Sequence, residues 1–154
     1  MQVNISGFGA RITLIASSTF PQGFTLSQFA DDADSLDIPE LAIADSGMGL
    51  NGTHVVWSKP GVIDLTLNMV PTTVEDKNLE ILHEANRVAE GKSVAGDVVT
   101  LSIAYANGAV VTLAEGIIVS GAPTLGISQA GRLKTRPYKF RFTKLGKTAA
   151  PMGA

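Results

Sequence analysis

Three glycines near the middle of the chain have the spacing of a dinucleotide-binding fingerprint. Gly47, Gly49 and Gly52 lie in the segment SGMGLNGTHVVW, residues 46–57. In a dinucleotide site a strand precedes the glycines and a helix follows them, so that amides at the helix N-terminus bind the pyrophosphate. Here the β-prone run HVVW, residues 54–57, follows instead. The sequence therefore predicts a hairpin tip at these glycines and no nucleotide site.

Other patterns that carry catalysis are missing from the sequence. The chain has no cysteine, and its two histidines, His54 and His83, do not have the spacing of a helical metal site. The run 126–131 is one residue too long for a nucleophile elbow, and no helical segment follows it. Carboxylates in the predicted helix are typical of solvated helix charges. We therefore predict no enzyme activity, no cofactor and no metal.

One segment predicts a helix, over about residues 74–89. Thr73 can cap its N-terminus, and Gly91 can supply the left-handed residue that ends it. Apolar residues at helical spacing form one stripe: Leu79, Leu82, Ala85 and Ala89. Ile81 and Val88 widen that apolar surface, which predicts that a second surface, such as another subunit, also contacts the helix.

The remaining segments predict strands with alternating faces. The predicted strands cover residues 11–17, 24–30, 36–45 with an interruption at Pro39, 62–69, 98–105, 110–115, 117–119 with a bulge at Gly116, and 136–144. Pro21 and Gly23 are expected to separate the first two, and Asn107-Gly108 predicts a tight hairpin. The fold predicted from this pattern is mainly β with one flanking helix.

Composition indicates one domain over residues 1–154, with an N-terminal arm at 1–10 and a flexible C-terminal tail at 146–154. Hydrophobic residues make up 45% of the chain, which is enough for one core. Only 17% of residues are charged, so we expect partners to cover part of the surface. No run of about 18 apolar residues predicts a membrane span, and the N-terminus does not resemble a secretion signal.

Charge is distributed unevenly along the chain. Between Ile12 and Ser58 there is no Lys or Arg, and beyond Glu115 there is no Asp or Glu. A basic segment can bind nucleic acid, but acidic and basic surfaces of two copies can also match in head-to-tail assembly. The sequence leaves both open, together with the simpler case of two solvated faces.

The order of these features resembles that of bacteriophage tail tube proteins, which are similar in fold to the tube-forming Hcp protein of type VI secretion. The resemblance rests on VIDLTLNMVPTTVEDKNLEILHEAN (residues 62–86), the Asn107-Gly108 hairpin and GIIVSGAPTLGISQAGRLKTRPYKFRF (residues 116–142). It covers roughly Gly47 to Lys144. The acidic stretch from Asp31 to Asp45 and the N-terminal arm have no counterpart in this resemblance.

The resemblance implies an antiparallel β-sandwich or half-barrel with one flanking helix, tail-tube-like or Hcp-like. It implies a structural virion protein whose hexameric rings stack into the inner tube of a phage tail, through which DNA reaches the host without specific binding. Expected partners are further copies of the chain, a tail sheath, a baseplate and a tape-measure protein, with synthesis in the bacterial host cytoplasm. The alternatives are a tube initiator, baseplate or terminator subunit, or a nucleic-acid-binding β-barrel that stacks bases on Tyr138, Phe140 and Phe142.

Three sets of residues receive roles under this resemblance. The inter-ring hairpin consists of Gly47, Met48, Gly49, Leu50, Asn51, Gly52 and Thr53. The candidates for subunit interfaces are Ile81, Val88, Arg132, Lys134, Lys139 and Arg141. A channel that passes DNA should not attract it, so the candidates for the lumen are acidic: Asp31, Asp32, Asp34 and Asp64.

Overall fold

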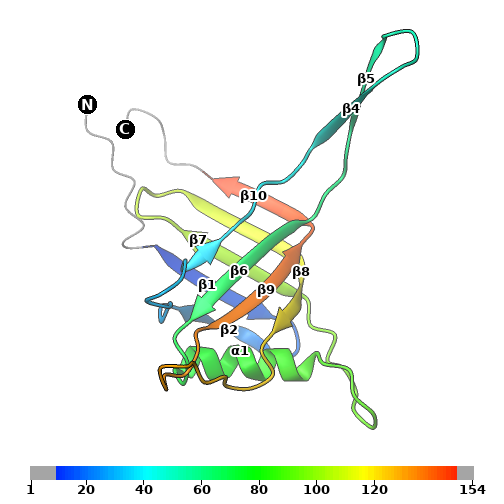
Figure 1. The fold of residues 1–154 in the computed structure, drawn as a ribbon. Helices are drawn as coiled ribbons and strands as arrows, with labels where there is room; N and C mark the ends of the chain where they lie inside the picture. The colour runs from blue at the N-terminus through cyan, green and yellow to red at the C-terminus, as the bar shows by residue number, and fades with distance from the viewer. Residues whose placement is uncertain (1–9, 149–154) are drawn as a thin grey trace.

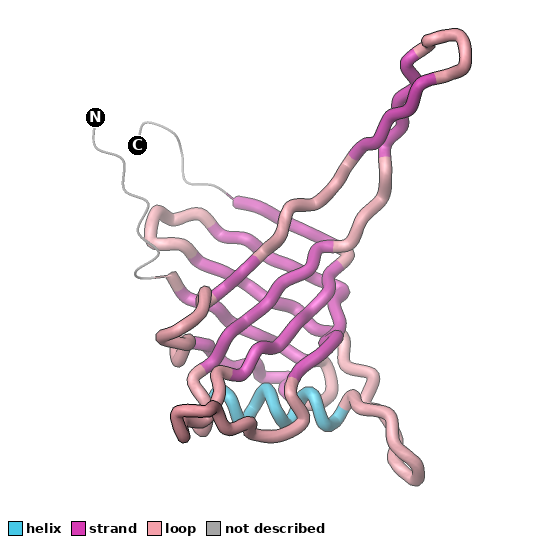
Figure 2. The backbone as a smooth tube through the Cα atoms, viewed as in Figure 1, coloured by secondary structure: helices cyan, strands magenta, loops and turns pink. Residues whose placement is uncertain are grey.

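The computed structural model describes residues 10–148. Its elements in chain order are β1 (Arg11–Ala16), β2 (Phe20–Leu26), β3 (Leu36–Asp37), β4 (Ala44–Met48), β5 (His54–Ser58), β6 (Ile63–Met69), α1 (Val74–Ala85), β7 (Val99–Ala104), β8 (Val110–Gly121), β9 (Arg136–Phe142) and β10 (Lys144–Thr148). Figures 1 and 2 show an antiparallel β body with α1 across one end and a hairpin projecting from the other. Most of the predicted arm 1–10, and residues 149–154 of the predicted tail, lie outside the described residues.

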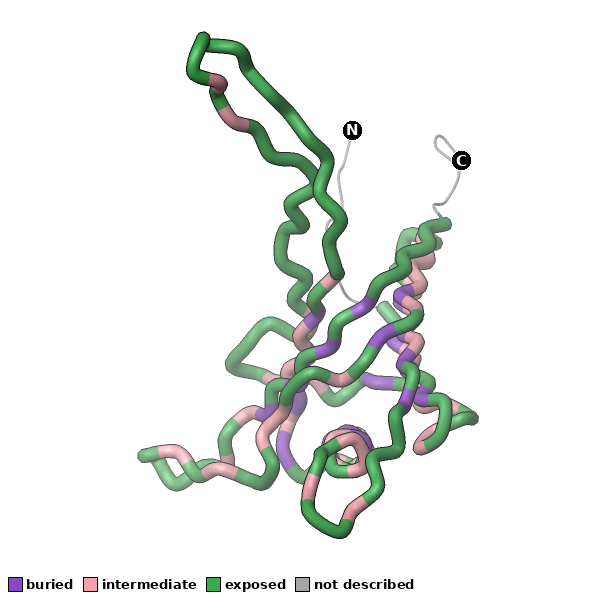
Figure 3. The backbone as a smooth tube through the Cα atoms, turned by 90° about the vertical axis from the view of Figure 1, so that its right-hand side faces the viewer, coloured by how far each residue is buried: buried purple, intermediate pink, exposed green. Residues whose placement is uncertain are grey.

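Strand β8 joins two layers of the body. The hydrogen-bonded order is β2-β1-β7-β8-β9-β6-β3, and β10 also pairs with β8. The first half of β8 pairs with β7 and β10, whereas its second half, from Ile117, pairs with β9. Between the halves, Glu115 has a positive φ of 53° and the register shifts, as in a β-bulge. The bulge bends β8 out of one layer and into the other, and Figure 3 shows the body from the side with α1 nearly end-on.

The core lies between these layers, because every second residue of a strand points inward. The buried hydrophobic residues are Ile12, Leu14, Ala16, Leu26, Leu65, Leu67, Met69, Leu79, Leu82, Val99, Leu101, Ile103, Leu113, Tyr138, Phe140 and Phe142. Leu79 and Leu82 come from α1, which covers one end of the sandwich. The predictions of a mainly β antiparallel fold with one flanking helix, and of the inward face of β9, are confirmed.

The helix is shorter than predicted. Thr73 is the N-cap as expected, since its hydroxyl accepts from the Asp76 amide at 3.2 Å. The helix ends at Ala85 and not at residue 89, because Asn86 takes over the capping: its side chain donates to the Leu82 carbonyl at 2.9 Å and also bonds Asp97. Gly91 has the expected positive φ of 70°, but in a turn beyond the helix. Val88 is therefore not a helical residue.

Two strand boundaries at the sheet edge also differ from prediction. Pro21 and Gly23 do not interrupt β2 but lie within it, because Gly23 has a positive φ of 75° where β2 bulges against β1. The predicted strand 36–45 consists of the short β3 and the first residues of β4, with Pro39 between them.

The C-terminal prediction is corrected as well. The strand predicted over 136–144 is divided at Thr143, and residues 144–148 form β10, which pairs with β8 from Lys144↔Ala114 to Thr148↔Val110. The first residues of the predicted flexible tail are thus paired in a sheet. The assignment of residues 1–154 to a single domain stays a prediction.

Candidate functional site

The most prominent surface feature is the β4–β5 hairpin, called here the arm (residues 44–58). It forms a separate two-stranded sheet, in register from Ala44↔Ser58 to Met48↔His54, and projects away from the body (Figure 1). At the tip, the Gly49 amide donates to the Thr53 carbonyl at 2.8 Å, and the Gly52 amide donates to the Gly49 carbonyl at 2.9 Å. Gly52 has a φ of 84°, a conformation that side chains rarely adopt. The predicted hairpin at residues 47–53 is confirmed in its geometry.

The arm carries no formal charge beyond its base. Asp45 and Lys59 pair there at 3.6 Å, and the intervening sequence has no Asp, Glu, Lys or Arg. Leu50 is fully exposed at the tip, Met48 is 73% exposed, and Val56 and Trp57 are also exposed. Isolated two-stranded hairpins are marginally stable, and exposed apolar patches mark interaction sites. The arm therefore has the properties of a surface that is covered by a partner.

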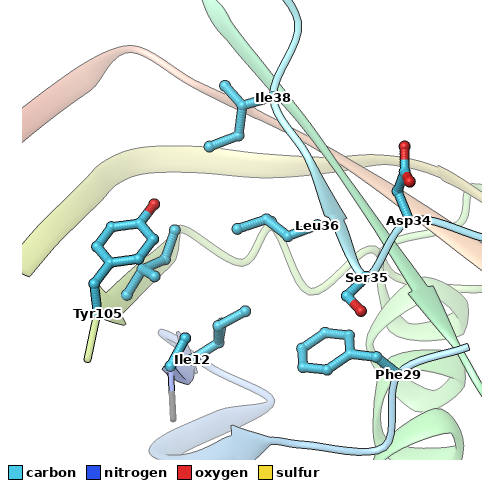
Figure 4. Close-up of a pocket in the computed structure, with 9 residues that line it drawn as sticks. Ile12, Phe29, Asp34, Ser35, Leu36, Ile38 and Tyr105 are labelled. Atoms are coloured by element: carbon cyan, nitrogen blue, oxygen red, sulfur yellow. The ribbon is translucent and has the colours of Figure 1, made fainter. Parts of the chain in front are cut away.

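A second apolar surface lies at the open end of the sandwich. One cavity, of about 560 Å³, is drawn in Figure 4 and is lined by Ala10, Ile12, Phe29, Asp34, Ser35, Leu36, Ile38, Ile103 and Tyr105. A second cavity, of about 500 Å³, is lined by Ile38, Pro39, Leu41, Ile63, Tyr105, Val111, Leu113, Leu145 and Lys147. The two share Ile38 and Tyr105, so we treat them as one inter-sheet cleft with mainly apolar walls.

The acidic and basic positions to which we assign separate roles are brought together by the structure. Arg132 donates to Asp31 at 2.6 Å, and Arg141 donates to Asp64 at 2.8 Å. The hydrogen bond from Arg132 holds the pKa of Asp31 below its ordinary value. The Thr135 hydroxyl bonds Asp32. The lumen candidates and interface candidates therefore share surfaces, and these surfaces are already charge-matched within one copy.

Three further candidates are Lys134, Lys139 and Asp34. Within residues 10–148, neither Lys134 nor Lys139 has an ion-pair partner, and Lys139 borders a shallow hollow with Asp37 and Asp64. Asp34 is exposed, and its main-chain carbonyl accepts a hydrogen bond from the side-chain amide of Asn68 at 2.7 Å. The part of the chain that the structure describes has no cluster of three metal-ligating side chains and no helix long and apolar enough to cross a bilayer.

The apolar interface candidates Ile81 and Val88 are both exposed, Ile81 on α1 and Val88 in the irregular segment that follows it. By contrast, the aromatic residues offered as base-stacking platforms, Tyr138, Phe140 and Phe142, are buried in the core. Buried rings cannot stack on bases, so that form of the nucleic-acid hypothesis is wrong.

A family model described as tail fiber protein gp32 matches residues 3–146 of the chain. The chain belongs to this family. The comparison with curated proteins gives no match.

Solved structures similar to this family member come from contractile injection systems. A chain of the anti-feeding prophage baseplate has a TM-score of 0.57 at 10% identity, over 97% of this chain and 98% of that chain. A chain of the sheath–tube complex of an extracellular contractile injection system has a TM-score of 0.55 at 11% identity, over 96% and 95% of the two chains. A chain of the tube-terminating cap of the anti-feeding prophage has a TM-score of 0.51 at 9% identity, over 97% and 94%. The shared fold therefore extends over nearly the whole chain.

The sequence did not reveal a buried polar cluster that joins α1 to β9. Asp76 and Arg136 are 1% and 2% exposed. Asp76 accepts from the Tyr138 hydroxyl at 2.8 Å and lies 3.5 Å from the Arg136 guanidinium, which also donates to Glu80 at 3.0 Å and to the Ala122 carbonyl at 2.8 Å. Burial and the bond to Asp76 raise the pKa of Tyr138. The sequence carried one signal for this cluster. Arg136 lies two residues before Tyr138, so the alternation of the strand places both side chains on its inward face.

Asp97 forms a second network that no sequence pattern indicated. Its carboxylate accepts from the Ser18 amide at 2.7 Å, the Thr19 amide at 2.8 Å and the Asn86 side chain at 2.9 Å, and it also bonds the Thr19 hydroxyl. Burial alone would raise the pKa of Asp97, but these hydrogen bonds outweigh it and hold the pKa below its usual value. The network joins the β1–β2 turn to the end of α1.

Proposed function

We propose that the chain is a structural subunit of a phage tail that forms hexameric rings, and that these rings stack into the inner tube through which DNA is delivered to the host. The observation that carries this proposal is the arm: a hairpin with an uncharged, mainly apolar tip that extends from a well-packed β-sandwich and that no other part of residues 10–148 covers. Such a feature stabilises an assembly rather than a monomer, because its apolar residues lose contact with water only when another molecule covers them.

The comparisons support a role in the tail. The family is described as a tail fiber protein family, and one similar fold belongs to a chain of a sheath–tube complex. A heterologous contact, in which different patches of identical copies meet, closes into a ring when its rotation allows. Ring closure would also cover sheet edges such as that of β10. An exposed edge has unpaired backbone groups that promote aggregation.

Each candidate residue has a place in this proposal. The hairpin residues 47–53 reach a neighbouring ring, and Ile81, Val88, Lys134 and Lys139 face other subunits, a sheath or a baseplate. In this proposal Asp31 and Asp64 line the lumen, and each neutralises an arginine of the same copy. A structure of the assembly in which Asp31 and Asp64 lie away from the bore would contradict this arrangement.

The test is negative-stain electron microscopy of the purified protein at high concentration, with light scattering after size exclusion. Stacked rings or tubes with a central bore are expected. Deleting Met48 to Thr53 should abolish tubes while circular dichroism still reports the folded body. Long tubes from the deletion variant would show that the arm has no role in assembly, and a monomer at every concentration and salt would contradict the proposal itself.

A baseplate, terminator or fibre subunit is a second candidate. It is favoured by the TM-scores to the baseplate and cap chains, 0.57 and 0.51, which bracket the value of 0.55 for the sheath–tube chain. The same microscopy separates the two candidates, because a tube subunit grows stacks of rings whereas a cap or baseplate subunit stops at one or two rings. Neither candidate requires an enzyme activity or a cofactor.

A further inference from the structure

The arm and the inter-sheet cleft have matching chemistry. The arm offers Leu50 and Met48 at an uncharged tip, and the cleft offers walls made mostly of aliphatic and aromatic side chains. Among the described residues that line the cleft, the charged ones are Asp34 in the first cavity and Lys147 in the second. An uncharged hairpin brings no ionised group of its own into such a space, whereas a charged segment would incur a desolvation penalty.

The arm cannot fill the cleft of its own copy. Leu41 and Ile63, which flank the base of the arm, line the cleft, while the strands β4 and β5 lead away from the body (Figure 1). From Ala44 to Leu50 the arm spans roughly 20 Å at the usual rise of a strand. The base is tightly packed, since a Cβ atom on Gly61 would lie only 2.6 Å from a methyl carbon of Leu41. The tip is therefore available only to another molecule.

We propose that the tip of the arm of one copy occupies the inter-sheet cleft of a second copy. This inference rests on the proposed function and names the surface that receives the arm. Each chain carries one donor and one acceptor at different places, so the contact is heterologous and can propagate from copy to copy. Because the cleft adjoins the base of the receiving copy's own arm, successive contacts join into one continuous apolar seam.

The absence of cysteine from the sequence allows a direct test by disulfide cross-linking. The double variant Leu50→Cys with Leu145→Cys places one thiol at the arm tip and one on the wall of the cleft. The matched control is Leu50→Cys with Lys144→Cys, because adjacent residues of β10 point to opposite faces of the sheet. Both proteins are assembled at high concentration, oxidised, and examined on a non-reducing gel, with light scattering before oxidation.

The expected result is a ladder of covalent multimers from the Leu145 variant, at least about tenfold more abundant than in the control. A ladder forms because each copy donates and accepts once, whereas thiols that meet only tip to tip stop at dimers. Normal assembly without a ladder above the control would overturn the inference alone and assign the cleft to another occupant. A protein that never assembles would overturn the proposed function and the inference with it, and a cross-linked monomer would show that the arm folds back.

Discussion

The body and the arm are stabilised in different ways. In the body, polar groups that are distant in sequence form contacts shielded from solvent, such as those of Asp76 with Arg136 and of Asp97 with Thr19. In the arm, the contacts are a short ladder of main-chain bonds, local side-chain bonds such as that from the Thr53 amide to Asn51, and an exposed ion pair between Asp45 and Lys59. Exposed ion pairs contribute little to stability, whereas buried networks are costly to break. The comparison indicates that side-chain contacts stabilise the body, whereas the apolar side chains at the tip of the arm contribute little to the stability of the single chain and, in our proposal, contact another copy.

The largest effect on stability is expected from Asp76→Ala. The substitution leaves the buried guanidinium of Arg136 with only Glu80 as a charge partner. It also leaves the Tyr138 hydroxyl with only the more distant main-chain carbonyl of residue 76, at 3.3 Å, as an acceptor. Breaking a buried pair in this way costs about 3–5 kcal/mol of the free energy of unfolding. Urea denaturation measures the change. The control Glu84→Ala removes an exposed carboxylate from the same helix and should change little, so equal losses in both variants would contradict the assigned role of the buried cluster.

Gly116→Ala is expected to have the next largest effect, because the bend in β8 depends on close packing. A Cβ atom at Gly116 would lie 2.2 Å from the buried ring of Phe142. Displacing such a ring typically costs about 1–3 kcal/mol of the free energy of unfolding. Gly126→Ala is the control, since its nearest neighbour is the flexible side chain of Lys134 at 3.2 Å. A Gly116 variant as stable as wild type by urea denaturation would show that the layers can shift to make room.

Asp97→Asn is expected to weaken the body in a pH-dependent manner. The folded-state pKa of Asp97 lies below its ordinary value, so the carboxylate contributes stability above about pH 4, and the contribution is lost as the pH falls through the folded-state pKa. The variant should therefore be less stable than wild type at pH 7, by about 1–2 kcal/mol, and approach it below pH 4. Urea denaturation at several pH values measures this difference. A difference that stays constant down to pH 2 would show that the charge of Asp97 does not matter.

Local patterns were enough to predict much of the body. Alternation identified the inward face of β9, and glycine and asparagine placed the hairpins, because these signals depend on neighbouring residues. The end of α1 was placed incorrectly because it is fixed by a bond from Asn86 to Asp97, a residue beyond the helix. Strand β10 was missed because Lys144–Thr148 has little periodicity and gains its order from pairing with β8.

The candidate site also combines features that local sequence patterns predict with features that depend on residues distant in sequence. The arm could be predicted because its turn chemistry is local, whereas the cleft could not, since its walls come from segments as far apart as Ile38 and Leu145. Sorting charges by sign along the chain suggested separate acidic and basic faces. The folded chain instead pairs Asp31 with Arg132, two residues that are close only in three dimensions.

The smallest effect on stability, and the sharpest contrast with the body, is expected from Leu50→Ser. The side chain is fully exposed in the monomer, so the substitution should change the free energy of unfolding by less than about 0.5 kcal/mol. In the proposed assembly the same leucine is an anchor, so the concentration needed for assembly should rise about tenfold or more. Light scattering across a dilution series measures that concentration.

The control is Ile127→Ser, which removes an aliphatic side chain that is also exposed but belongs to a loop of the body. If both substitutions raise the assembly concentration equally, the effect comes from surface hydrophobicity in general. If Leu50→Ser instead lowers the free energy of unfolding as much as a core substitution, the arm is part of the folding unit. The arm and the body differ in role if Leu50→Ser weakens assembly but leaves the free energy of unfolding unchanged. A side chain that contributes nothing to the stability of the monomer can affect assembly only through contact with another molecule.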